Sequence, residues 1–102
     1  MSFQSFTFSS QNSNFTAASG FHYSVATQIS GNLTVTLPAI SGLSAGDTLR
    51  IKFASQAGSN TIVVQTTGSD TIDTSSSDLP INTLYSAVTF VANTSQTDWE
   101  TV

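Results

Sequence analysis

Charged residues are scarce in this chain and cysteine is absent. Only 8% of the 102 residues are charged, and Arg50 and Lys52 are the only basic residues besides a single histidine. Sequence-independent binding to nucleic acid or to an anionic membrane requires several cations, so we exclude both partners. The absence of cysteine excludes a disulfide framework and thiolate chemistry.

Two targeting features are also missing from the sequence. The first thirty residues lack the basic start and continuous apolar run of a signal peptide, and no run has the length of a transmembrane helix. We therefore expect a protein that is made in the cytoplasm without a signal peptide.

The composition favours strands over helices. About a third of the residues are Ser or Thr, 38% are hydrophobic, and glutamate occurs once, at Glu100. Thr and Val suit pleated surfaces, whereas good helix formers are few. A chain of this length has room for one hydrophobic core, so we predict a single all-β unit.

Short runs of alternating apolar and polar residues predict the strands. Residues 48–54 are the clearest case, and we expect residues 61–66 to be their hairpin partner. Residues 86–91 and 98–102 predict a second hairpin, which places Trp99 over the core. Turns every eight to twelve residues indicate a compact sandwich or jelly-roll-like barrel of about seven or eight short antiparallel strands. The predicted core consists of Leu33, Val35, Leu37, Leu49, Ile51, Phe53, Ile62, Val64, Ile72, Val88, Phe90 and Trp99.

Several segments, taken in order, resemble a known structural module. They are GNLTVTLPA, GDTLRIKFAS, NTIVVQT, SDTID and LYSAVTFVAN, followed by a tryptophan near the chain end. This order is similar to a recurrent β module of tailed-phage virion proteins, found in head-decoration proteins, head fibres and the tips of tail fibres and spikes. The resemblance covers about residues 31–102. Thr74 stands where the family often has glycine, and YSAVT replaces a tighter spacing.

The resemblance implies both a place and a role for the chain. It implies a homotrimer on the outer capsid surface of the virion, where a capsid decoration (cement) protein binds the major capsid protein of a bacteriophage and stabilises the head. The alternative within the same family is the receptor-binding tip of a head fibre or of a tail fibre or spike. In either case the protein is a structural one and not an enzyme, and it needs no cofactor.

The scarcity of lysine and proline bears on assembly. Open sheets usually guard their edge strands with Lys, Pro or inward charges, and this chain has one Lys and two Pro. Either the sheets close into a barrel or neighbouring subunits cover the edges, and we favour the second.

The chain divides at about residue 30. Residues 31–102 form the predicted β-sandwich module, and residues 1–30 form an aromatic N-terminal arm with the first strand or strands. Five of the seven phenylalanines lie in the first 21 residues. They either line the core or dock on a capsid as interface anchors, and both can hold. Our candidate interface residues are Phe3, Phe6, Phe8, Phe15, Arg50 and Lys52. The competing interpretation of Arg50 and Lys52 is that they are exposed charges that only keep the protein soluble.

No set of residues predicts catalysis or metal binding. His22 has no second histidine or cysteine to work with, so we expect it in packing or at an interface. Asp70, Asp73 and Asp78 lack the alternating ligands of a calcium loop and fit turn capping better, although a site shared across a trimer axis stays open. Asp98 and Glu100 flank Trp99, and we expect both to be solvated.

Overall fold

Ten strands and one short 3-10 helix make up residues 6–102, the part of the chain that the computed structural model describes. The elements are β1 (Thr7–Gln11), β2 (Phe15–Thr16), β3 (Phe21–Ala26), β4 (Leu33–Thr36), η1 (Ile40–Gly42), β5 (Thr48–Ser55), β6 (Ile62–Gln65), β7 (Thr71–Ile72), β8 (Leu79–Ile81), β9 (Ala87–Asn93) and β10 (Asp98–Thr101). Within these residues no helix is long and apolar enough to cross a membrane. The all-β prediction is confirmed.

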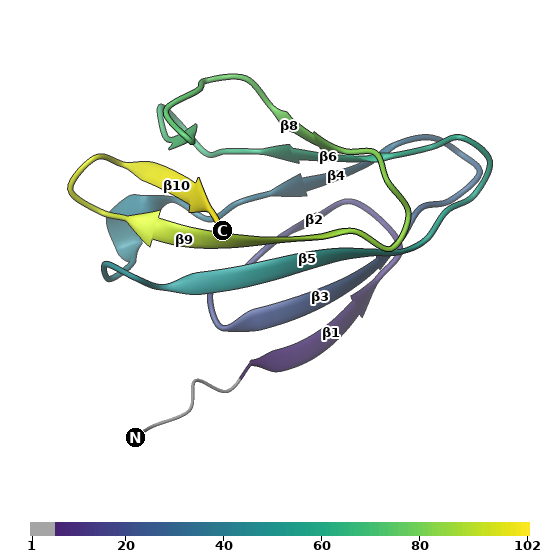
Figure 1. Cartoon of the computed structure of the whole chain (residues 1–102), viewed down its shortest axis with the longest axis horizontal. Coiled ribbons are helices and arrows are strands. Elements are labelled where there is room, and N and C mark those ends of the chain that lie inside the picture. The colour runs from purple at the N-terminus through teal and green to yellow at the C-terminus, as the bar shows by residue number, and fades with distance from the viewer. Residues whose placement is uncertain (1–5) are drawn as a thin grey trace.

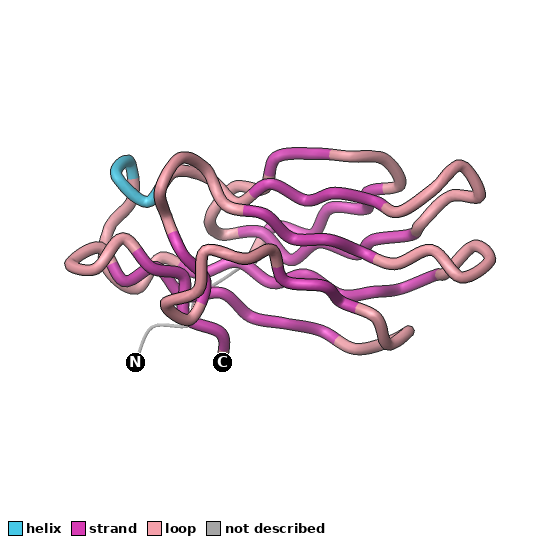
Figure 2. The backbone as a smooth tube through the Cα atoms, turned by 90° about the horizontal axis from the view of Figure 1, so that it is seen from above, coloured by secondary structure: helices cyan, strands magenta, loops and turns pink. Residues whose placement is uncertain are grey.

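The strands form two sheets that face each other. The larger sheet has the order β1-β3-β5-β9-β10-β7, and the smaller has the order β2-β4-β6-β8. The strands run along the length of the molecule, and the connecting loops gather at its two ends (Figures 1 and 2). The predicted sandwich is therefore confirmed, with two open sheets in place of a closed barrel.

The first six strands wind around the core. The chain crosses from one sheet to the other after each strand, so β1, β3 and β5 lie parallel in the larger sheet and β2, β4 and β6 lie parallel in the smaller. The last four strands close the molecule differently. Here β8 runs antiparallel to β6, β9 runs antiparallel to β5, and β10 lies between β9 and β7.

The ten strands of residues 6–102 exceed the predicted seven or eight, and two details of the predicted topology are wrong. Five of the eight strand pairings are parallel, so the sheets are not antiparallel throughout. The expected hairpin of residues 48–54 with 61–66 does not form, because β5 and β6 belong to different sheets. The physical reason is that alternation reports which face of a strand is buried and carries no information on the partner strand. The turn at residues 56–60 crosses the gap of about 10 Å between packed sheets.

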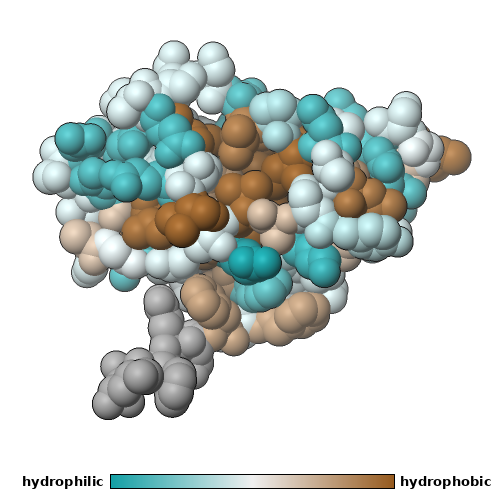
Figure 3. Space-filling view, viewed as in Figure 1, coloured by the Kyte–Doolittle hydropathy of each residue, from teal (hydrophilic) through white to brown (hydrophobic). Residues whose placement is uncertain are grey.

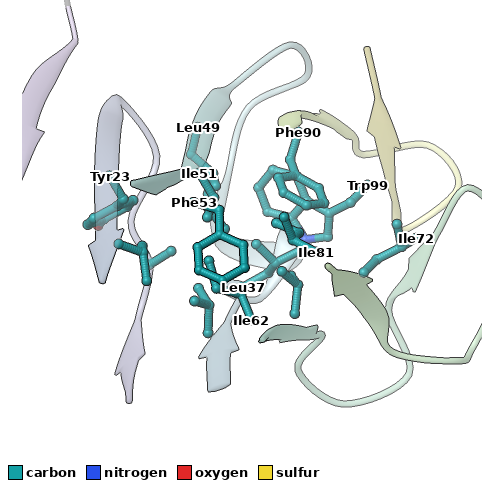
Figure 4. Close-up of a cluster of buried hydrophobic side chains, with 14 of the residues drawn as sticks. Tyr23, Leu37, Leu49, Ile51, Phe53, Ile62, Ile72, Ile81, Phe90 and Trp99 are labelled. Carbon is teal, nitrogen blue, oxygen red and sulfur yellow. The ribbon is translucent and has the colours of Figure 1, made fainter. Parts of the chain in front are cut away.

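One hydrophobic core lies between the sheets. Figure 4 shows side chains from both sheets meeting there, with Trp99 beside Phe90 and Ile72. Of the twelve predicted core residues, eleven belong to this cluster of buried residues, and Val88 packs against it half-buried. Inward and outward residues alternate along β4, β5 and β6, as burial on one face requires.

The sequence-based boundary near residue 30 falls in the turn between β3 and β4. Strand β3 lies along the full parallel ladder with β5, and its residues Tyr23 and Val25 are buried in the same core as the later strands. The hydroxyl of Tyr23 accepts a hydrogen bond from the N–H of Ala18 at 2.8 Å. In the described residues, the strands before and after this turn thus share one core.

The C-terminal hairpin holds the chain end in place. β9 and β10 pair antiparallel, and Trp99 on β10 is fully buried. The expectation that Asp98 is solvated is wrong, because its side chain is only 2% exposed. Its Oδ1 accepts hydrogen bonds from the Thr71 hydroxyl at 2.6 Å and the Thr74 N–H at 2.8 Å. Asp98 thereby ties the last strand to β7, which no local pattern in the sequence signals.

Candidate docking face on the larger sheet

The outer side of the larger sheet collects the basic residues of the chain. Tyr23 and Val25 on β3 and Leu49, Ile51 and Phe53 on β5 point inward, so the residues between them point outward. The register then aligns Phe8, His22, Arg50 and Thr89 in one row across four strands. The next row contains Ser10, Ser24, Lys52 and Ala87. We call these two rows the basic face.

The side chains of the first row lie close together in two pairs. The rings of Phe8 and His22 have centroids 6.0 Å apart, and the Arg50 guanidinium donates a hydrogen bond from Nη1 to the Thr89 hydroxyl at 3.3 Å. Phe8 is 66% exposed and Arg50 is exposed as well. A large apolar ring and a guanidinium, both open to solvent, are the kinds of group that anchor protein interfaces.

Most of the six acidic side chains of the chain are bonded to neutral donors. Five of them accept hydrogen bonds from backbone N–H groups or from an amide: Asp47, Asp70, Asp73, Asp98 and Glu100. These acids act as turn and strand caps, with Asp70 receiving the N–H of Ile40 at 2.9 Å. None of these hydrogen bonds involves Arg50 or Lys52.

A shallow cavity adjoins the basic face. It has a volume of about 420 Å³, and small side chains line much of it, among them Ser10, Ser24, Ala26 and Ala54. Ser10 and Ser24 belong to the same row as Lys52. A projecting side chain of a partner can enter this cavity while the basic residues beside it pair with acidic groups.

The face ends in an open strand edge. Among residues 6–102, the sheets have four edge strands: β1, β7, β2 and β8. β8 carries Pro80 and follows Asp78, β7 has only two residues and lies between Asp70 and Asp73, and β2 has only two residues. Strand β1 alone combines five residues with no charge and no proline. It therefore lacks the features that usually prevent strand addition.

The backbone of β1 presents bonding groups at this edge. Thr7 donates its N–H to the carbonyl of Gly20 at 2.9 Å, on the β3 side. In a parallel ladder, alternate residues bond to opposite sides, so the N–H and C=O groups of Phe8 and Ser10 face outward. The exposed ring of Phe8 and the open edge thus occupy the same strand.

The structure distributes the predicted interface residues over several places. Phe8, Arg50 and Lys52 lie together on the basic face, and Phe6 is partly exposed just before β1. Phe15 is not on this face: it is half-buried on β2, and its ring lies 4.7 Å from that of Tyr23. Phe3 lies outside the described residues. Sequence reasoning did not place His22 beside Arg50, because no local signal aligns segments 28 residues apart.

Figure 3 shows one face of the molecule, in the view of Figure 1. Apolar side chains gather in the middle of the view, with hydrophilic ones around them. Among residues 6–102 there is no group of three or more His, Cys, Asp or Glu side chains that could hold a metal ion.

No protein-family model matches the chain, and a search of curated proteins returns no significant match. The phage-module resemblance of residues 31–102 therefore stays a prediction.

Proposed function

We propose that this chain is a capsid decoration (cement) protein of a bacteriophage, which binds the outer surface of the head and stabilises it. The observation that carries the proposal is the basic face: every Lys and Arg of the chain lies there, next to an exposed phenylalanine and an unguarded strand edge. The resemblance of residues 31–102 to virion modules supports the same role. The partner is the major capsid protein, and the action is binding without catalysis or cofactor.

The proposed docking combines three contributions. Arg50 and Lys52 pair with an acidic patch of the capsid, and five of the six acidic side chains of the chain itself are bonded to neutral donors. Phe8 enters an apolar pocket of the partner and acts as the anchor. Copies repeated over the capsid lattice multiply modest contacts, because each bound copy raises the effective concentration of the next contact.

We further propose that the protein assembles as a homotrimer. The two sheets do not close on themselves, so the edge of β1 needs a cover, and a neighbouring subunit is the cover we favour. Sedimentation equilibrium of the purified chain measures this directly. A trimer mass is the expected result, and a monomer at all concentrations would refute the assembly.

The location is tested with gold-labelled antibody against this chain on intact virions, viewed by electron microscopy. Label spread regularly over the head is the expected result. Label confined to the tail tip would instead favour the alternative, a receptor-binding tip of a fibre. Particles without label would refute any role in the virion.

The docking face is tested with two double variants of equal charge change. Arg50→Gln with Lys52→Gln removes two positive charges from the basic face, and Asn82→Asp with Gln96→Glu adds two negative charges in exposed loops elsewhere. In a sedimentation assay with capsids that lack the protein, the first variant should bind at least about tenfold more weakly, which corresponds to the loss of two charge pairs. The second should bind nearly as well as wild type. Equal loss in both would mean that net charge matters and the basic face does not.

A further inference from the structure

A second cavity lies at the end of the molecule, away from the basic face residues Arg50 and Lys52. Its walls come from the β1–β2 and β3–β4 connections, at the right-hand end of the view in Figure 1. Its volume is about 370 Å³, within the usual range of small-molecule sites. Six of its eight lining residues carry an amide or a hydroxyl group: Asn12, Ser13, Asn14, Gln28, Ser30 and Asn32.

Two of these amides are held in fixed orientations by the backbone. Oδ1 of Asn14 accepts the N–H of Thr34 at 2.8 Å, and Oδ1 of Asn32 accepts the N–H of Thr61 at 2.9 Å. These bonds assign the oxygen of each carboxamide, so the orientation of its NH₂ group is settled as well. Neither Nδ2 donates to another of residues 6–102, which leaves both NH₂ groups for a ligand.

The turn that forms one wall is also held in place. The carbonyl of Gln28 accepts a hydrogen bond from Nδ2 of Asn60 at 2.6 Å, and Gln28 forms a bridge with Gly31. The backbone of this wall is therefore fixed before binding, so little conformational entropy is lost when a ligand binds.

The chemistry of the lining restricts the ligand. None of the lining residues is charged, so a phosphate or carboxylate would find no cation to pair with. An apolar ligand would remove the amides from water without replacing their hydrogen bonds, which is unfavourable. A neutral ligand rich in hydroxyl groups needs no cation and can replace the hydrogen bonds that the amides make with water. Its hydroxyl oxygens accept from NH₂ groups, and its hydroxyl hydrogens can be donated to amide oxygens.

We propose that this cavity binds a neutral saccharide. The NH₂ groups of Asn14 and Asn32 donate to its hydroxyl oxygens. The proposal is independent of the basic face and of binding to a capsid.

The test uses a double variant that keeps the local fold. Asn14→Asp with Asn32→Asp retains an oxygen to accept the N–H of Thr34 and of Thr61, but replaces each free NH₂ with a second acceptor. The control is Asn82→Asp with Gln96→Glu, which adds the same charge in exposed loops outside the cavity. Neutral and acidic oligosaccharides are first screened on an array with the wild-type chain, and the neutral ones that bind are titrated while backbone amide spectra are recorded by NMR.

The expected result is that neutral oligosaccharides bind and shift the amide signals of residues 12–14 and 28–32. The cavity double variant should bind at least about tenfold more weakly, as the loss of two hydrogen-bond donors predicts, while the control binds like wild type. If the double variant does not fold, Gln28→Leu replaces it, because that side chain is exposed and only its backbone carbonyl is bonded. No neutral binder on the array, signal shifts elsewhere, or undiminished binding by the variant would each overturn the proposal.

Discussion

Trp99 provides the sharpest test of how the core is stabilised. It is fully buried, and its indole Nε1 finds no hydrogen-bond partner among residues 6–102. The ring therefore contributes apolar contacts, while its one polar group is buried without compensation. These two effects have opposite signs, and two substitutions separate them.

Trp99→Ala removes the contacts and leaves a cavity. An aromatic side chain of this kind buries about 150–250 Å², which at about 25 cal/mol per Å² amounts to about 4–6 kcal/mol. Measured truncations of buried Phe or Trp to Ala cost about 3–5 kcal/mol. A domain of this length has a free energy of unfolding of about 5–15 kcal/mol, so this variant should lose a large share of its stability.

Trp99→Phe keeps most of the ring contacts and removes the unpartnered N–H. Burying an unsatisfied donor costs about 1–3 kcal/mol, and relief of that cost offsets the smaller ring. We expect a net loss below about 1.5 kcal/mol. The control Phe90→Leu shrinks another buried ring that has no polar atom, and it should lose about 1–2 kcal/mol with nothing to offset it.

Urea unfolding followed by circular dichroism measures all three variants without relying on tryptophan fluorescence. A loss for Trp99→Phe well above about 1.5 kcal/mol would refute the reasoning, because it would mean that the indole N–H is satisfied in the folded state, for example by a buried water. The fluorescence of the wild-type chain gives an independent check. Its single tryptophan should emit as a buried indole and shift to longer wavelength on unfolding.

Two further substitutions test single contacts, both by urea unfolding. Asp98→Ala should cost about 2–3 kcal/mol, because it leaves the Thr74 N–H without its acceptor. Asp98→Asn keeps an oxygen for this N–H and should cost less than about 1 kcal/mol. Equal losses would show that the charge of Asp98 matters and its hydrogen bonds do not. Tyr85 is 69% exposed and has a φ of 72°, a left-handed conformation that asparagine adopts more readily. Tyr85→Asn should therefore raise the free energy of unfolding by about 0.5–1 kcal/mol, and a decrease would show that the exposed ring contributes a stabilising contact.

The burial pattern could be predicted from the sequence alone. The alternation in residues 48–54 placed Leu49, Ile51 and Phe53 in the core, and the spacing of residues 86–101 predicted the β9–β10 hairpin. Such local signals suffice because period-two alternation and short turns act between neighbours in the chain. The low charge content is a property of composition alone, and it argues against nucleic acid as a partner whatever the fold.

The pairing of distant strands could not be predicted in this way. The first six strands wind around the core, and the number of residues between paired strands is not constant. Residue 7 pairs with residue 21, whereas residue 22 pairs with residue 50. No periodicity in the sequence therefore marks these pairings. Because the sheets are joined by crossovers, β5 lies beside β3 and β9 rather than beside β6. That pairing is what places Phe8 and His22 in one row with Arg50.

The candidate sites depend on the same long-range register. In the sequence, Asn14 and Asn32 resemble ordinary turn residues. Only the parallel pairing of distant strands places the side-chain oxygen of each beside the backbone N–H that donates to it. The position of Asp98 in a short terminal strand predicts a solvated side chain, whereas in the structure it pairs with β7, 27 residues earlier in the chain. The sequence by itself determined which side chains are buried through its alternation, because that preference is local. The tertiary structure alone decided which exposed side chains meet, because strand register is set by the packing of the whole core.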